Sequence, residues 1–319
     1  PALAGRLTYS IRWSDAASVG RMSQRPYAAP PGPWRASRPA VVGHRGARGL
    51  IPENTIASVR AAIDAGCSGV ELDVRLSADG HVIVWHDATL DPLKCRSTDV
   101  DYSGARVDDL TLAQLRTVDV GSPLSPRFPR QRPAHDERIV TLGQLFAACA
   151  QATDVWWIVE VKVDPTDPRE VSTRHTLVDR VLASIAEAGV QRRSFVHSFD
   201  WTVLELARQL DPERPRSALA VVGDTFAPAS PWLGRVKWED HRGDLASAAS
   251  ELEVAVISPD VPSCDVELVS RAHALNLAVV PWTVNDPAEI RRLVKADVDG
   301  IVTDDPDLVL DVVRGEFPG

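Results

Sequence analysis

Side chains that could move protons or bind ions stand at the ends of short apolar runs early in the chain. His44 and Arg45 follow the run VVG, and His86 follows VIVW. In the intervening run GVELDV, Glu71 and Asp73 share one face of the predicted strand, because successive side chains of a strand alternate between its two faces. Two carboxylates on one face are suited to binding a divalent cation.

A second strand-like run, VWWIVEVKV, repeats this arrangement later in the chain. It places Glu160 and Lys162 on one face, with valines on the other. Three carboxylates, two imidazoles, an arginine and a lysine could hold an oxyanion through a metal ion and cationic side chains while the histidines move protons. We therefore expect hydrolysis of a phosphate ester.

The elements that must position these groups follow an alternating pattern. From residue 40, short apolar strands alternate with helical segments, which favours a parallel sheet or barrel. Nine strand candidates end near Gly43, Val74, Val84, Val163, Val196, Val222, Ile257, Val280 and Val302. One must be accessory to an eight-stranded barrel, and the short gap containing Ala78-Asp79-Gly80 is the best place for a hairpin. Helices are expected over residues 53–65, 142–151, 171–188, 201–210, 266–275 and 287–294.

All the candidate residues occupy equivalent places in this pattern. In an eight-stranded α/β barrel, functional side chains gather at the C-terminal ends of the strands. The two histidines, the three carboxylates and Lys162 all lie where apolar runs end, so we expect a single site. The alternative for Glu71 and Asp73 is the solvent-facing edge of a half-buried strand.

The chain resembles the glycerophosphodiester phosphodiesterases. The motifs that carry the resemblance occur in the family's order between about residues 40 and 310: His44-Arg45-Gly46, Pro52-Glu53-Asn54-Thr55, Glu71-Leu72-Asp73-Val74, Asp79-Gly80, His86-Asp87, Glu160-Val161-Lys162, Ser198-Phe199, Trp282-Thr283-Val284-Asn285 and Thr303-Asp304. The resemblance implies a TIM-type (β/α)8 barrel with a small insertion after the strand ending in His86. It also implies that His44 and His86 are catalytic and that Glu71, Asp73 and Glu160 bind one divalent cation, Mg²⁺ or Ca²⁺.

Four further residues are expected to bind the substrate: Arg45, Glu53, Lys162 and Trp282. Arg45 can make two parallel hydrogen bonds to phosphate, and Lys162 can add a point charge. The resemblance places Glu53 at the site. Each has a structural alternative. Arg45 can pair with a neighbouring structural carboxylate, and Lys162 can pair with Glu160. An acidic residue suits the helix start after Pro52 in any case, and Trp282 can simply line the barrel.

These observations predict metal-dependent hydrolysis of glycerophosphodiesters to sn-glycerol 3-phosphate and an alcohol, with the histidines as general acid and base. The residues do not assign the two roles, and the nucleophile is either water or a hydroxyl of the substrate's glycerol. One alternative is a phospholipase D type hydrolysis of lysophospholipids, which requires an apolar groove beside the site. Another is a barrel that binds phosphodiesters without catalysis, although such a protein would not need a pair of histidines.

The composition narrows the classes of partner. The chain has 319 residues and a net charge of −9, which argues against binding to nucleic acid or to anionic membranes. No apolar run approaches the roughly 20 residues that a membrane-spanning helix needs. We expect a small-molecule substrate, no transmembrane segment and a cytoplasmic location; the composition gives no indication of oligomeric state. The four cysteines lie far apart and are expected to be reduced thiols.

Changes in composition suggest how the chain is organised. Residues 1–39 are rich in proline and are expected to form an extended or disordered leader, with Met22 as a candidate native start. Residues 40–319 are expected to form one catalytic barrel domain. Within it, 88–140 break the strand–helix pattern and are expected to be an inserted subdomain. The stretch 226–253 is expected to be irregular and to overhang the site.

Overall fold

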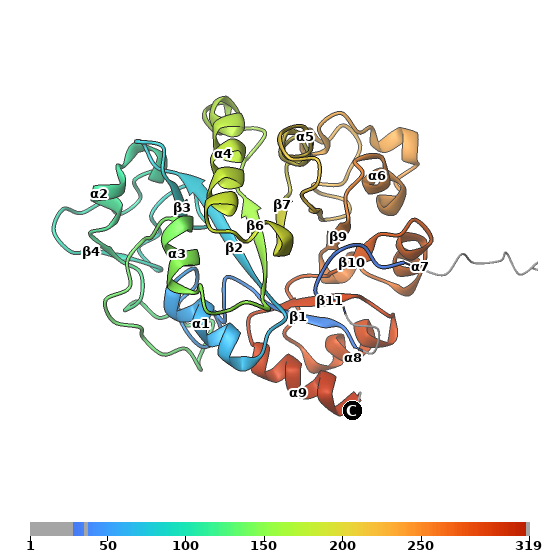
Figure 1. Cartoon of the computed structure of the whole chain (residues 1–319), viewed down its shortest axis with the longest axis horizontal. Helices are drawn as coiled ribbons and strands as arrows, with labels where there is room; N and C mark the ends of the chain where they lie inside the picture. The colour runs from blue at the N-terminus through green and yellow to red at the C-terminus, as the bar shows by residue number, and fades with distance from the viewer. Residues whose placement is uncertain (1–27, 35–37, 317–319) are drawn as a thin grey trace, which may run out of the picture.

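The computed structural model describes residues 28–34 and 38–316, and a barrel of parallel strands lies at its centre (Figure 1). In the described part of the chain, the barrel strands are β1 (Ala40–Gly43), β2 (Gly69–Leu76), β6 (Trp156–Val161), β7 (Ser194–Ser198), β8 (Arg216–Ala220), β9 (Val256–Pro259), β10 (Ala278–Val279) and β11 (Gly300–Thr303). Their order is β10-β9-β8-β7-β6-β2-β1-β11. The Val302 N–H donates to the Pro281 carbonyl, which nearly closes the barrel. The predicted α/β barrel is confirmed.

The remaining strand of this sheet, β3 (Val82–Val84), forms the predicted hairpin with β2. The two strands are antiparallel, and Val84 lies opposite Val74. Gly80 has a φ of 77° in the turn, a conformation that glycine adopts at little cost. After β3, the N–H of Trp85 donates to the Asp73 carbonyl at 3.0 Å. The hairpin therefore returns the chain to the barrel mouth just before His86.

Helices surround the barrel (Figure 1). Those described are α1 (Ile56–Ala65), α2 (Leu112–Leu115), α3 (Leu142–Ala148), α4 (Pro168–Glu187), α5 (Trp201–Leu210), α6 (Leu245–Glu251), α7 (Val266–Ala274), α8 (Pro287–Lys295) and α9 (Pro306–Glu316). The six expected helices are present. Helix α1 begins later than predicted because the Thr55 side chain caps it by accepting from the Ser58 N–H. The irregular stretch expected over 226–253 is wrong at its end, where α6 forms behind the capping residue Asp244.

The alternation along the strands separates two environments. Leu72 and Val159 point outward into the core between strands and helices and are fully buried. Inside the barrel, a separate apolar cluster includes Phe195 and Val302, and Trp34 packs on it with its ring centroid 6.0 Å from that of Phe195. These contacts fill the end of the barrel where the strands begin. The charged interior residues are therefore confined to the opposite end, where the strands finish.

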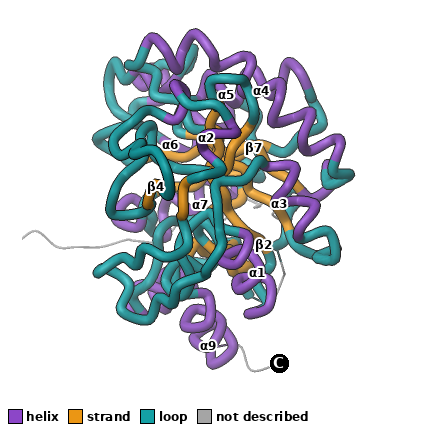
Figure 2. Tube along the Cα trace, turned by 90° about the vertical axis from the view of Figure 1, so that its left-hand side faces the viewer, coloured by secondary structure: helices purple, strands orange, loops and turns teal. Residues whose placement is uncertain are grey.

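Residues 88–140 form a loop-rich segment beside β3, and Figure 2 shows its loops on the face turned toward the viewer. It contains α2 and a pair of short antiparallel strands, β4 (Arg96–Ser97) and β5 (Val118–Asp119). Its apolar side chains form their own buried cluster around Leu90, Leu115 and Ile139. The expected break in the strand–helix pattern is confirmed, while the domain boundaries stay a prediction.

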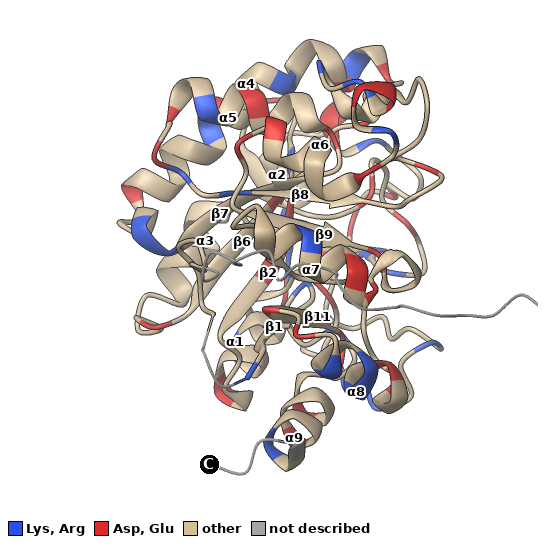
Figure 3. Ribbon diagram, turned by 90° about the vertical axis from the view of Figure 1, so that its right-hand side faces the viewer, with Lys and Arg blue, Asp and Glu red and all other residues tan. Residues whose placement is uncertain are grey.

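Other features concern the surface and the chain end. Acidic and basic residues are interspersed along the outer helices (Figure 3). Within the described ranges, no helix is both long enough and apolar enough to cross a membrane. The four cysteines are buried and unpaired, as expected. The predicted leader, with Met22, lies mostly outside the described residues, and the cytoplasmic location stays a prediction.

Candidate active site

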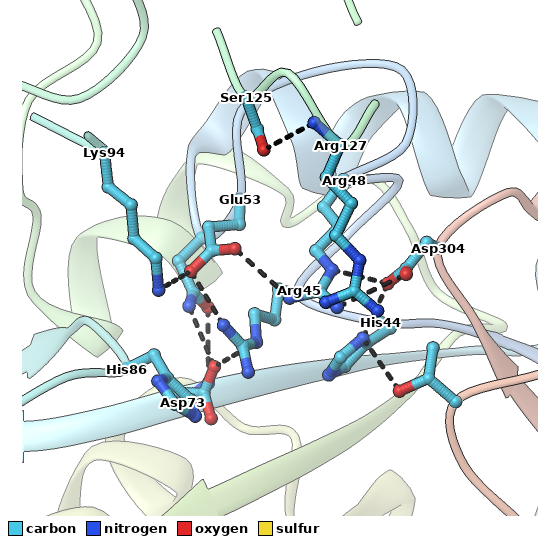
Figure 4. A network of polar contacts seen from close by, with 12 residues as sticks. His44, Arg45, Arg48, Glu53, Asp73, His86, Lys94, Ser125, Arg127 and Asp304 are labelled. Atoms are coloured by element: carbon cyan, nitrogen blue, oxygen red, sulfur yellow. Dashed lines mark hydrogen bonds and ion pairs between the residues drawn. The ribbon is translucent and has the colours of Figure 1, made fainter. Parts of the chain in front are cut away.

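Eight of the nine predicted site residues lie together where the barrel strands end, and the ninth, Trp282, lies beside them on the segment after β10. The eight are His44, Arg45, Glu53, Glu71, Asp73, His86, Glu160 and Lys162. Ion pairs and hydrogen bonds connect seven of them, and His86 joins them indirectly through Asp87 and Lys94. Figure 4 shows the links of Arg45 to Glu53 and to Asp73. The expectation that residues at the ends of separate strands form one cluster agrees with this geometry; their roles are a separate question.

Three carboxylates form the centre of the cluster. One oxygen atom of each of Glu71, Asp73 and Glu160 lies within 4.8 Å of the others, and the residues are only 2%, 0% and 7% exposed. Glu71 Oε1 and Asp73 Oδ1 are buried without a hydrogen-bond partner. Burial, followed by the charges of Asp73 and Glu160, raises the pKa of Glu71 well above its usual value. A hard divalent cation would satisfy these oxygens and relieve their repulsion, so the donor set fits such an ion.

Two cations approach the same carboxylates. Lys162 Nζ lies 2.6 Å from Glu160 Oε1 and 3.7 Å from Asp73 Oδ1, while Arg45 Nε lies 3.1 Å from Asp73 Oδ2. Burial acts to raise the pKa of Asp73, but the charges of Arg45, His86 and Lys162 outweigh it and hold that pKa well below its usual value. The ion pair between Lys162 and Glu160, the structural alternative to phosphate binding, is present in the structure.

His44 is held by a carboxylate from the other end of the chain. Its Nδ1 lies 2.7 Å from Asp304 Oδ1, and its Nε2 lies 3.9 Å from Glu71 Oε2. Arg48 and Asn285 both donate to Asp304, at 2.5 Å and 2.7 Å. Burial lowers the pKa of His44 to about 4. The imidazole is therefore neutral at neutral pH, with Nδ1–H donated to Asp304 and Nε2 turned toward the carboxylate cluster.

His86 has a similar but more accessible arrangement. Its Nδ1 lies 2.6 Å from Asp87 Oδ1, and Lys94 Nζ donates to Asp87 Oδ2 at 2.7 Å. The side chains of His86 and Asp87 are both 27% exposed. On the backbone side, Arg75 Nε donates to the His86 carbonyl at 2.7 Å. Asp87 does not follow the strand alternation because β3 ends at Val84, and it holds His86 instead of turning away from the site.

The loop after β1 carries two residues in the left-handed backbone region. Arg45 has a φ of 52° and Asn54 a φ of 57°, a conformation that costs a non-glycine residue about 1 kcal/mol. It lets the Arg45 N–H donate to Glu71 Oε2 at 2.9 Å, while Asn54 Nδ2 donates to Asp73 Oδ2 at 2.9 Å. Such backbone strain is typical of functional sites. The loop is folded around the two carboxylates of β2.

Glu53 joins three cations on the outer side of Arg45 (Figure 4). Its carboxylate lies 2.7 Å from Arg45 Nη1, 3.3 Å from Arg48 Nη1 and 3.1 Å from Lys94 Nζ. Burial acts to raise its pKa, but the charges of Arg45, Lys94 and Arg48 outweigh this effect and lower the pKa to about 2. Glu53 is therefore an anion that aligns three cations, and its role in substrate binding stays a prediction.

Aromatic side chains lie near Lys162. The Lys162 Nζ is 5.7 Å from the centre of the Phe199 ring, and that ring makes edge contacts with Trp282 and Trp232 at 5.3 Å and 6.0 Å. Trp282 Nε1 donates to the Ser258 carbonyl at 2.8 Å. Trp282 thus belongs to an aromatic wall made of Phe199, Trp232 and Trp282, rather than to the polar network.

The sequence interpretation missed several members of the network. Asp304 follows the apolar run GIVT, the same signal that identified His44, and Asp87 stands directly beside His86. Arg48 gave only the signal of a second arginine in the loop after β1. Lys94 gave none, because it lies in the 88–140 segment, where no strand end predicts its position.

Most of the chain is similar to one known protein family. Residues 44–308 match the model of the glycerophosphoryl diester phosphodiesterase family. A glycerophosphodiester phosphodiesterase of Caldanaerobacter subterraneus subsp. tengcongensis is 28% identical over 274 residues, which cover 86% of this chain and 97% of that protein. The match therefore includes both the barrel and its insertion.

Solved structures agree with the family match. A candidate glycerophosphoryl diester phosphodiesterase from Silicibacter pomeroyi is 31% identical with a TM-score of 0.79, covering 89% of this chain and 96% of that one. A phosphodiesterase from Oleispira antarctica, solved with its product sn-glycerol-3-phosphate, is 24% identical with a TM-score of 0.68, covering 87% of this chain and 97% of that one. The second likeness shows a shared fold.

Proposed function

Since this chain belongs to the glycerophosphoryl diester phosphodiesterase family, and is therefore an enzyme of the phosphodiester hydrolase class, we propose that it cleaves glycerophosphodiesters to sn-glycerol 3-phosphate and an alcohol. One observation carries the proposal: three buried carboxylates lie beside two histidines that are each held by a further carboxylate. The product complex of the Oleispira antarctica enzyme supports the choice of product.

We further propose that Glu71, Asp73 and Glu160 bind one divalent cation, Mg²⁺ or Ca²⁺. Their unpartnered buried oxygens and mutual repulsion support this role. When bound, the ion would polarise a phosphoryl oxygen as a Lewis acid. Arg45 and Lys162 stand beside these carboxylates and would bind the remaining phosphoryl oxygens as negative charge develops. Lys162 would then share its charge between Glu160 and the substrate.

The two histidines would move the protons. In each, a carboxylate accepts from Nδ1, which leaves Nε2 to exchange a proton with the substrate. One histidine takes the proton of the nucleophile, which is water or the substrate's own glycerol hydroxyl. As the phosphorus–oxygen bond to the alcohol breaks, the other histidine gives a proton to the departing oxygen. A barrel that only binds phosphodiesters would need the cations but not these paired histidines.

The aromatic wall of Phe199, Trp232 and Trp282 favours a second candidate, phospholipase D type cleavage of lysophospholipids. An acyl chain could pack on these half-buried rings, which lie beside the polar site. The reaction and the catalytic groups would be the same, and only the substrate would be larger.

The test is release of sn-glycerol 3-phosphate from a glycerophosphodiester by the purified chain, after chelation and after Mg²⁺ or Ca²⁺ is restored. We expect release that needs the metal and is abolished in His44→Asn and His86→Asn. His175→Asn, which alters an exposed histidine of α4, is the matched control and should keep full activity. Release that persists under chelation would overturn the metal role. Cleavage of lysophospholipids alone would favour the second candidate.

A further inference from the structure

A pocket of 370 Å³ opens beside the proposed catalytic groups. The loop after β1 lines one side with Arg45, Arg48 and Glu53, and the 88–140 segment lines the other with Lys94, Arg127 and Phe128. Figure 4 shows Lys94, Glu53 and Arg48 together on the outer side of Arg45. The pocket therefore exists only because the 88–140 segment folds over this side of the barrel mouth.

The lining places the pocket on one side of the reacting phosphate. His86 and Arg45 line it, but His44 and the three clustered carboxylates do not. A phosphodiester has two ester arms, and its phosphorus must lie near the carboxylate cluster and between the two histidines. One arm then points into this pocket. Because His86 lines this pocket, the ester oxygen of a substrate arm bound there would lie within reach of its proton.

The charges in the pocket are unevenly compensated. Arg48 is held by Asp304 and Glu53, and Lys94 is held by Asp87 and Glu53. Arg127 is exposed, and among the described residues it forms no ion pair with a carboxylate. Its guanidinium carbon lies 5.8 Å from the centre of the Phe128 ring. An anionic group on the substrate arm would supply the missing partner of Arg127.

An ammonium group would bind weakly in the same pocket. Quaternary ammonium groups are bound by open aromatic faces. The Phe128 ring already contacts two guanidinium groups, since the Arg48 carbon lies 5.1 Å from its centre. The other aromatic residue of the lining, Trp85, is only 3% exposed. The lining carries four cationic side chains, of Arg45, Arg48, Lys94 and Arg127, against two carboxylates, of Glu53 and Asp91. A cationic arm would therefore meet an excess of positive charge without an aromatic cage.

We propose that this pocket receives the departing alcohol and selects alcohols that carry an anionic group over those that carry an ammonium group. The proposal rests on the proposed function and adds a head-group class to it. The selecting residue is Arg127, with Lys94 and Arg48 as the fixed cationic background. The glycerol arm then lies on the side of the aromatic wall.

The test compares kcat/KM for two substrates with the full-length protein supplied with Mg²⁺ and, separately, Ca²⁺, at low ionic strength. In bis(glycerophospho)glycerol, the alcohol arm carries a second, negatively charged phosphodiester; in glycerophosphocholine, it carries a quaternary ammonium. After correction for the two equivalent ester bonds of the first substrate, we expect it to be preferred by about tenfold, since the difference combines the attraction of one arm with the repulsion of the other. The preference should shrink in high salt.

A charge reversal then identifies the residue responsible. Arg127→Glu should lower the ratio of the two kcat/KM values about tenfold, because it replaces one attraction by one repulsion. Arg116→Glu is the matched control: it makes the same charge change at an exposed position of the same segment, outside the pocket lining. This control should leave the ratio unchanged.

The outcomes separate this inference from the proposed function. Equal kcat/KM values for the two substrates, or a preference for the choline ester, would overturn the inference and leave the proposed function intact. An equal loss of preference in both variants would also overturn it, since the effect would then be long-range. Absence of hydrolysis for both substrates with either metal would overturn the proposed function and this inference with it.

Discussion

The Asp304 carboxylate lies 2.7 Å from Nδ1 of His44, although the two residues are separated by 260 positions in the chain. They are neighbours because β11 pairs with β1 in parallel, so that Thr303 lies opposite Gly43 and the next residue of each strand points into the mouth. Arg48, from the same loop as His44, and Asn285, from the segment after β10, both donate to this carboxylate. Asp304 therefore fixes which nitrogen of His44 carries the proton.

Replacement of Asp304 by asparagine should reveal this role. The amide can donate to Nδ1 and favour the wrong tautomer, so we expect kcat to fall about 10³- to 10⁴-fold, as for the carboxylate of a serine protease triad. Substrate KM should change little. The matched control is Asp305→Asn, which alters the neighbouring carboxylate that faces Arg130 on the surface. Steady-state kinetics, with circular dichroism to verify folding, would show the role to be wrong if both variants behaved alike.

The pairing of His44 with Asp304 also shows where sequence reasoning stops. The ends of apolar runs identified His44, Glu71, Asp73 and Glu160, because a strand's two-residue period and the direction of parallel strands are local properties. The carboxylate partner of each histidine could not be predicted from local sequence. It depends on the closure of the barrel for Asp304, and on the end of β3 for Asp87.

Most of the other site residues that the sequence did not predict lie in the 88–140 segment. The barrel and its hairpin followed from alternation and from Gly80, but Lys94 and Arg127 are placed by turns and by a small apolar cluster with no regular period. Helix α6 was hidden for another reason. Its sequence LASAASE is rich in alanine and serine and has a weak apolar pattern, so its cap Asp244 was the only clear signal.

Replacing Glu71 in the carboxylate cluster by glutamine should stabilise the metal-free protein and weaken its stabilisation by metal. Glu71→Gln removes a buried charge whose pKa is raised by burial and by Asp73 and Glu160. A carboxyl group whose pKa is raised by folding destabilises the folded state as pH rises above its unfolded-state pKa. The metal-free variant should therefore have a higher melting temperature than the metal-free wild type at pH 7. Added Mg²⁺ or Ca²⁺ should stabilise the wild type, by about 2.7 kcal/mol at a hundredfold excess over Kd, and the variant much less.

Thermal melts with chelator and with added metal would test both effects. Glu187→Gln, in the last turn of α4, gives a control for loss of one carboxylate at an exposed position. If metal raised the melting temperature of Glu71→Gln as much as that of the wild type, Glu71 would not be a ligand.

The ion pairs of Glu53 should make part of the free energy of unfolding depend on pH in the acid range. Burial alone would raise its pKa, but Arg45, Lys94 and Arg48 lower it from 4.5 to about 2. A carboxyl group whose pKa is lowered by folding stabilises the folded state at pH values above its unfolded-state pKa. This contribution to the free energy of unfolding, about 3 kcal/mol, is lost as pH falls from about 4.5 to 2. Glu53→Gln should therefore unfold with a flatter dependence of stability on pH in this window. Denaturant titrations from pH 2 to 6 would measure it, and an unchanged slope would contradict the assignment.

Arg75 is predicted to position His86 without touching the substrate. Its Nε donates to the His86 carbonyl, and its Nη1 lies 2.8 Å from Glu170 at the start of α4. Arg75→Met should release the His86 loop and lower kcat about tenfold, since it removes the charge-assisted hydrogen bond of about 1.5 kcal/mol to the His86 carbonyl, while KM changes little. The melting midpoint should fall only modestly, because Arg106 still pairs with the buried Glu170. Arg75→Lys keeps the charge and should restore part of kcat, because one donor can still reach the carbonyl. A purely structural role for Arg75 would instead lower stability and leave kcat of the folded enzyme unchanged.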